Sequence, residues 1–98
     1  LIDKADVKNE DPNWPAYKKY FMHGTSHHMG LDTHDYGLLW EPMKANMVFT
    51  VEPGIYIPDE GFGIRLEDDV VIQESGEPFN LMRNIPIEAE EIENIMNS

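Results

Sequence analysis

The chain has 98 residues, no cysteine, and 7 basic against 19 acidic side chains, which gives a formal net charge of −12. This charge repels nucleic-acid phosphates and anionic membrane surfaces, and no apolar run reaches the roughly 20 residues of a membrane-spanning helix, so we expect no nucleic-acid and no membrane partner. Without cysteine there is no disulfide, no thiolate nucleophile and no cysteine-ligated metal site, and we expect a reducing, cytoplasmic location.

The first third of the chain has weak structural signals. Residues 1–15 are polar and interrupted by Pro12 and Pro15, which predicts a loop-like lead-in. Residues 16–21 fit either a helical turn or the approach to a strand. Residues 23–37 contain all four histidines and three glycines. That composition predicts a strand interrupted by irregular, tightly turned backbone.

The remainder has clearer signals. Apolar, β-branched or alternating runs predict strands at residues 47–51, 55–57, 64–67, 70–72 and 79–82. Turn residues separate these runs at 58–61 and 74–77. Residues 87–96 place apolar side chains at helical spacing with glutamates on the other face, which predicts a C-terminal helix. Together these elements predict an α+β fold, mainly an antiparallel sheet closed by one C-terminal helix.

Three of the four histidines, His23, His27 and His34, lie close together in the chain. His23 and His27 are four apart, as in zinc proteases of the H-E-x-x-H type, but Gly24 stands where that motif needs glutamate. A single histidine is more often structural than a ligand, whereas three among glycines that allow close backbone approach favour a site. Spacing alone leaves both interpretations open.

Three charged residues of the predicted sheet could complete such a site. Glu52 directly follows an apolar strand, where it is either a turn residue facing water or a carboxylate that needs a partner. Strand alternation puts Arg65 and Glu67 on one face, either as a solvated ion pair or in a cleft where Glu67 binds a cation and Arg65 orients carboxylates. Imidazole nitrogens and carboxylate oxygens suit manganese, cobalt, zinc or iron(II), and carboxylates can bridge two ions.

Three sequence blocks resemble a known family. H-G-T-S-H-H-M-G-L-D-T-H-D (residues 23–35) is similar to the histidine block of aminopeptidase P, the Xaa-Pro aminopeptidases of the pita-bread metallopeptidase family (M24). V-E-P-G-I-Y (residues 51–56) and G-I-R-L-E-D-D (residues 63–69) resemble the next two blocks of that family, in the same order. The resemblance implies that the chain is the C-terminal part of a pita-bread fold, a curved and mainly antiparallel sheet with a C-terminal helix.

The resemblance also implies roles for individual residues. His27, Glu52 and Glu67 would be metal ligands, with Glu67 bridging two divalent ions, most often manganese but also cobalt or zinc. His23 and His34 would lie beside the metals to bind substrate and stabilise the tetrahedral intermediate. Glu52 would also shuttle a proton, and Arg65 would support the site electrostatically. The implied reaction is attack by a metal-bridging hydroxide on the bond between an N-terminal residue and a following proline, in a homo-oligomeric enzyme.

Members of this family also need two aspartate ligands and a further histidine from the first half of the catalytic domain. Asp3, Asp6 and Asp11 lie too close to the histidine block to replace those aspartates. We therefore expect residues 1–98 to be the C-terminal portion of a pita-bread catalytic domain, with residues 1–15 as a loop. Such a fragment would carry half a site, would be inactive alone and would bind metal weakly at best.

Three alternatives stay open. Prolidases, which cleave Xaa-Pro dipeptides, resemble the same blocks, and Ser26 before the ligand histidine is the residue that favours aminopeptidase P. Pita-bread relatives without metal catalysis, such as creatinase or histone-chaperone domains, are marked by loss of ligands, but His27, Glu52 and Glu67 are all present. The third alternative is an acidic interaction module without a metal site.

Overall fold

The computed structural model describes residues 2–38 and 40–98, so Leu1 of the predicted lead-in lies outside the described residues. The described residues form two short helices, one on each side of five strands along the chain. A 3-10 turn at Ala16–Lys19 lies between the first helix and the first strand, and another at Pro58–Glu60 lies between the second and third strands. In chain order the helices and strands are α1 (Lys4–Lys8), β1 (Val48–Val51), β2 (Gly54–Ile57), β3 (Phe62–Arg65), β4 (Asp68–Val71), β5 (Phe79–Asn80) and α2 (Ala89–Met96).

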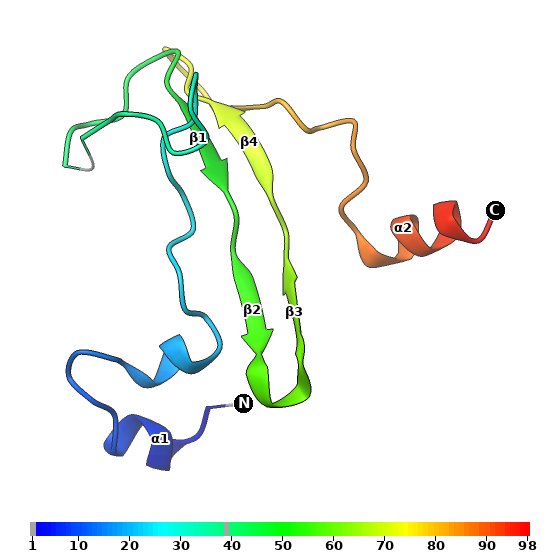
Figure 1. The fold of residues 1–98 in the computed structure, drawn as a ribbon. Coiled ribbons are helices and arrows are strands. Elements are labelled where there is room, and N and C mark those ends of the chain that lie inside the picture. The colour runs from blue at the N-terminus through cyan, green and yellow to red at the C-terminus, as the bar shows by residue number, and fades with distance from the viewer. Residues whose placement is uncertain (1, 39) are drawn as a thin grey trace.

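One long antiparallel hairpin dominates the structure (Figure 1). β1 pairs with β4 and β2 pairs with β3, and the register Val51↔Asp68 continues without a slip into Gly54↔Arg65. The ladder is interrupted between these two pairs, where the same register places Glu52 opposite Glu67. The hairpin reverses at the 3-10 turn Pro58–Glu60, which ends at Gly61 in the left-handed conformation (φ 71°).

β5 adds a third strand to one end of the hairpin, in the sheet order β1-β4-β5. The turn predicted at residues 74–77 connects β4 to β5, and Gly76 provides a positive φ of 82° there. β5 is shorter than the predicted run 79–82 because the Met82 backbone N–H donates to the Asn80 side chain instead of to a strand. The antiparallel α+β architecture predicted from the sequence is confirmed.

The prediction of a loop over residues 1–15 is wrong at Lys4–Lys8, which form α1. Asp3 caps this helix, because its carboxylate accepts from the backbone N–H groups of Ala5 and Asp6. The Asp6 carboxylate in turn accepts from the Asp3 backbone N–H, which completes a capping box. Two local carboxylates therefore specify a short helix in a segment without hydrophobic periodicity.

α2 confirms the predicted C-terminal helix, but it does not close the sheet. Figure 1 shows α2 beyond an extended connection, away from the hairpin, and its residues are exposed. Of the described residues, none belongs to a helix that is both long and apolar enough to cross a bilayer. The interior is small: Phe49 and Thr50 of β1 are 7 % and 1 % exposed.

Candidate functional site

The histidine segment lies along the open edge of β1 as an irregular extended chain. The Thr50 backbone N–H donates to the His27 carbonyl (3.0 Å), the Met29 N–H donates to the Val48 carbonyl (3.0 Å), and the Glu52 N–H donates to Thr25 (2.7 Å). The single β-bridge in this segment pairs His28 with Phe49. The predicted interrupted strand is therefore present as a series of backbone contacts, and these contacts bring the histidines to β1.

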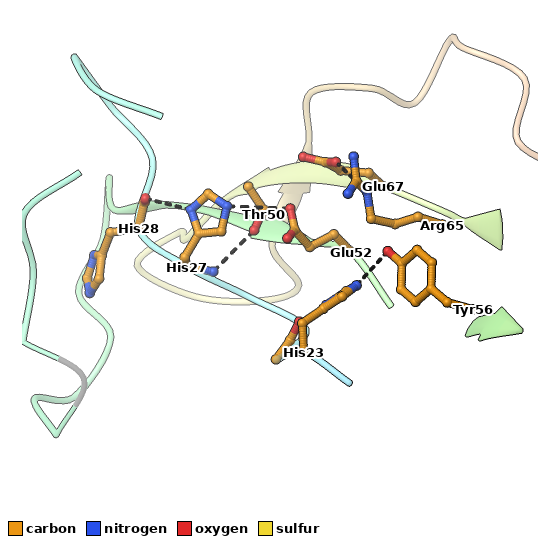
Figure 2. A network of polar contacts seen from close by, with 9 residues as sticks. His23, His27, His28, Thr50, Glu52, Tyr56, Arg65 and Glu67 are labelled. Atoms are coloured by element: carbon orange, nitrogen blue, oxygen red, sulfur yellow. Dashed lines mark hydrogen bonds and ion pairs between the residues drawn. The ribbon is translucent and has the colours of Figure 1, made fainter. Parts of the chain in front are cut away.

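The predicted site residues fall on one face of the hairpin because alternate residues of a strand share a face. Glu52 and Glu67 lie opposite one another at the interruption of the ladder, and Arg65 lies two residues from Glu67 on the same face. The histidine segment supplies His23 and His27 from the adjacent edge, as Figure 2 shows. Three segments that are distant in sequence thus contribute to one polar surface, made of His23, His27, His34, Glu52, Tyr56, Arg65 and Glu67, which we call the polar face.

His27 is held at both ring nitrogens. Its Nδ1 lies 3.0 Å from the His28 carbonyl oxygen, a contact in which Nδ1 carries the hydrogen, and its Nε2 lies 3.4 Å from the Glu52 carboxylate. The His34 ring stands edge-on to the His27 ring with 4.4 Å between centroids. Nε2 is thus the ring nitrogen that faces the Glu52 carboxylate, and it is the nitrogen available to a metal when Nδ1 donates to a carbonyl.

Glu52 and Glu67 form a pair of like charges. Burial, the negative charge of Glu52 and hydrogen bonding with the Glu52 carboxyl raise the pKa of Glu67 above its usual value. Arg65 offsets this repulsion in part, because its Nε lies 3.6 Å from the Glu67 carboxylate. Two carboxylates at opposite positions of the hairpin, one of them beside an imidazole nitrogen, supply donor atoms that suit a divalent cation.

Tyr56 joins His23 to the rest of the polar face. Its hydroxyl lies 2.7 Å from His23 Nε2, and its interaction with Arg65, together with the Glu67 carboxylate, raises the pKa of Arg65. The contacts form three groups: His34 with His27 and Glu52, Arg65 with Glu67, and Tyr56 with His23. The register of the hairpin brings these groups to one face. Sequence reasoning missed Tyr56, although alternation from Glu52 through Gly54 places it on the polar face.

The structure brings the six predicted site residues to one region of the hairpin, where their contacts are pairwise. Among the residues that the structure describes, no three His, Cys, Asp or Glu side chains come close enough together to hold a metal ion. The chemistry of the donor set, one imidazole nitrogen and two opposed carboxylates, nevertheless fits a divalent cation. The predicted ligand set His27, Glu52 and Glu67 stays a prediction.

Comparisons with known proteins identify the family. The family model for metallopeptidase family M24 matches residues 3–74. The Xaa-Pro aminopeptidase of Escherichia coli (strain K12) is 45 % identical over 93 residues, covering 83 % of this chain and 21 % of that protein. Xaa-Pro aminopeptidase 3 of Homo sapiens is 37 % identical over 108 residues, covering 97 % of this chain and 21 % of that protein.

A solved structure gives the same result for the fold. Aminopeptidase PepP of Pseudomonas aeruginosa superposes with a TM-score of 0.77 at 40 % identity, over 84 % of this chain and 22 % of that one. The predicted pita-bread class and the resemblance to aminopeptidase P are confirmed. The chain spans about a fifth of the length of the relatives it matches. It belongs to metallopeptidase family M24.

Proposed function

We propose that this chain contributes to a metal-dependent Xaa-Pro aminopeptidase, a hydrolase that removes an N-terminal residue from peptides with proline in second position. The observation that carries the proposal is the opposition of Glu52 and Glu67 at the interruption of the hairpin, with His27 Nε2 3.4 Å from Glu52. Relatives named Xaa-Pro aminopeptidase and the family match support the same activity.

In this proposal His27, Glu52 and Glu67 hold two divalent ions, manganese before cobalt or zinc. Such ions supply Lewis acidity and an activated nucleophile when they are bound. Glu52 would move a proton from the nucleophile to the leaving amine, because a carboxylate can accept a proton and then donate it. Arg65 keeps Glu67 oriented through their 3.6 Å ion pair.

His23 and His34 act on the substrate. His23 Nδ1 lies 2.6 Å from the Gly24 carbonyl oxygen and Nε2 lies 2.7 Å from the Tyr56 hydroxyl, so His23 would bind the oxygen on which negative charge develops by exchanging its contact with Tyr56. His34 is exposed next to the His27 ring, where it can contact the peptide. In this proposal His23 and His34 orient the substrate, and the metal ligands are other residues of the polar face.

The test uses the protein encoded by the full open reading frame, assayed with manganese, cobalt or zinc. We expect cleavage of an Xaa-Pro-Xaa tripeptide, little cleavage when alanine replaces proline, and loss of at least about 100-fold in kcat for Glu52→Gln. Glu60→Gln, the same change at an exposed turn, is the matched control and should keep full activity.

Other results would redirect the proposal. Cleavage restricted to Xaa-Pro dipeptides would assign a prolidase instead. A folded protein that cleaves nothing with any of the three metals would favour a non-catalytic pita-bread binding domain. We expect the 98-residue chain alone to be inactive, and proline-specific cleavage by that chain would contradict this expectation.

A further inference from the structure

Thr50 is the most deeply buried side chain of the described residues, although it is polar. It is 1 % exposed, lies in the middle of β1, and shares the polar face with Glu52 two residues later. Burying a hydroxyl group is unfavourable unless it is hydrogen-bonded. A valine would fill the same volume in a strand at lower cost, so the hydroxyl calls for a physical explanation.

The hydroxyl replaces a backbone carbonyl. In a regular antiparallel ladder two paired residues exchange both N–H···O=C hydrogen bonds. Here the Thr50 N–H donates to the His27 carbonyl at 3.0 Å, but the His27 N–H donates to Thr50 Oγ1 at 3.1 Å (Figure 2). At His27, therefore, a side chain supplies the second hydrogen bond that fixes the histidine chain to β1.

His27, the residue fixed in this way, supplies an imidazole ring to the polar face. His27 Nδ1 lies 3.0 Å from the His28 carbonyl, and Nε2 lies 3.4 Å from Glu52. Because the Nδ1 contact ties the ring to the adjacent main chain, the position of Nε2 relative to Glu52 depends on where the His27 main chain lies. Thr50 fixes that position because it bonds both the backbone N–H and the backbone carbonyl of His27.

We infer that Thr50 is a positioning residue, whose hydroxyl holds the His27 backbone so that Nε2 lies beside Glu52. The inference rests on the proposed function for its metal-binding consequence, but its structural half is independent of any metal. Outer hydrogen bonds of this kind orient metal-ligating histidines, and their loss costs about 10- to 100-fold in metal affinity.

The first experiment needs no metal. In the protein encoded by the full open reading frame, amide hydrogen exchange at His27 is compared between wild type, Thr50→Val and Thr50→Ser. We expect exchange about tenfold faster in Thr50→Val, which has the same shape without the acceptor, and near wild-type exchange in Thr50→Ser, which keeps it. Val51→Thr, at the exposed neighbouring position, is the control for a general loosening of β1.

Two results would overturn the inference. One is unchanged His27 exchange in Thr50→Val, and the other is exchange in Thr50→Ser as fast as in Thr50→Val. If Thr50→Val does not fold, Thr50→Ala against Thr50→Ser makes the same comparison, because both lose the methyl group and only alanine loses the hydroxyl.

The second experiment measures manganese affinity by calorimetry in the same variants. We expect Thr50→Val to bind about 10- to 100-fold more weakly, and Thr50→Ser to bind within about threefold of wild type. Equal affinity of wild type and Thr50→Val would overturn the positioning role alone. No manganese binding by wild type, or binding by Glu52→Gln as tight as by wild type, would instead overturn the proposed function, while the exchange data would still decide how His27 is held.

Discussion

The two faces of the hairpin are built from the same strands and have opposite character. On the polar face, side chains from three segments contact one another, including His23 with Tyr56, His27 with Glu52, and Arg65 with Glu67. On the other face, Val51, Ile55, Ile64 and Leu66 are 41 %, 44 %, 63 % and 47 % exposed. Contacts between side chains of this chain organise the polar face, whereas the side chains of the apolar face make few such contacts.

The difference shows that a site can be arranged without a large core beneath it. Backbone ladders fix the strands, and alternation then places each side chain on its face. The apolar face, together with Phe21 and Pro53, lines a hollow that only apolar groups would fill well. An apolar surface of this kind is typical of a face that packs against further protein.

The largest expected effect is a loss of turnover when side chains of the polar face are replaced, with no such loss on the other face. In the protein encoded by the full open reading frame, we expect His23→Phe to lower kcat about 100-fold and Tyr56→Phe about 10-fold, because the first removes the imidazole that would bind substrate and the second removes only the hydroxyl that holds it. Ile64→Thr, on the other face, should keep kcat per folded molecule. Steady-state kinetics with equal manganese loading check this, and a loss of turnover in Ile64→Thr would break the comparison.

A second effect concerns the packing that joins the histidine segment to β1. A Cβ atom at Gly37 would overlap the His28 ring, which packs on Phe49 with 4.5 Å between centroids. We expect Gly37→Ala to lower the free energy of unfolding by about 1–3 kcal/mol, measured by chemical denaturation. Gly24→Ala is the matched control, since nothing lies within 4 Å of its Cβ position. Equal stability of the two variants would show that His28 moves aside freely.

A smaller effect tests the like charges on the polar face. Glu67→Gln removes the repulsion from Glu52, so in metal-free protein we expect it to stabilise the fold by about 0.2–1 kcal/mol while it weakens manganese binding. The raised pKa of Glu67 makes this gain absent at low pH, where the carboxyl is protonated in both folded and unfolded states. The gain should appear as the pH rises through that pKa, and denaturation curves from pH 4 to 8 would show it. A gain that is constant with pH would assign it to another cause.

The smallest effect concerns the exposed apolar face of the 98-residue chain by itself. We expect Leu66→Thr to change its stability by no more than about 0.5 kcal/mol and to reduce its aggregation, because Leu66 is 47 % exposed. In the protein from the full open reading frame, the same change should cost more if that face is covered. Thermal unfolding of both proteins makes the comparison, and equal small changes would show that the face stays open.

Local sequence signals predicted much of this fold. β-branched runs predicted the strands around Val48–Val51 and Gly54–Ile57, and amphipathic spacing predicted α2. The predicted strand at residues 64–67 was displaced, because β3 ends at Arg65 where the ladder is interrupted. α1 was missed because two carboxylate caps specify it rather than a hydrophobic pattern.

The sequence by itself determined which residues could do chemistry: His23, His27, His34, Glu52, Arg65 and Glu67 were all identified from residue type, spacing and family resemblance. Only the tertiary structure decided that Glu52 lies opposite Glu67, that Tyr56 supports His23, and that the Thr50 hydroxyl holds His27. The physical reason is that alternation along a strand is local, whereas register is a relation between segments. Local preferences choose the face of each side chain, and hydrogen bonds between segments choose its neighbours.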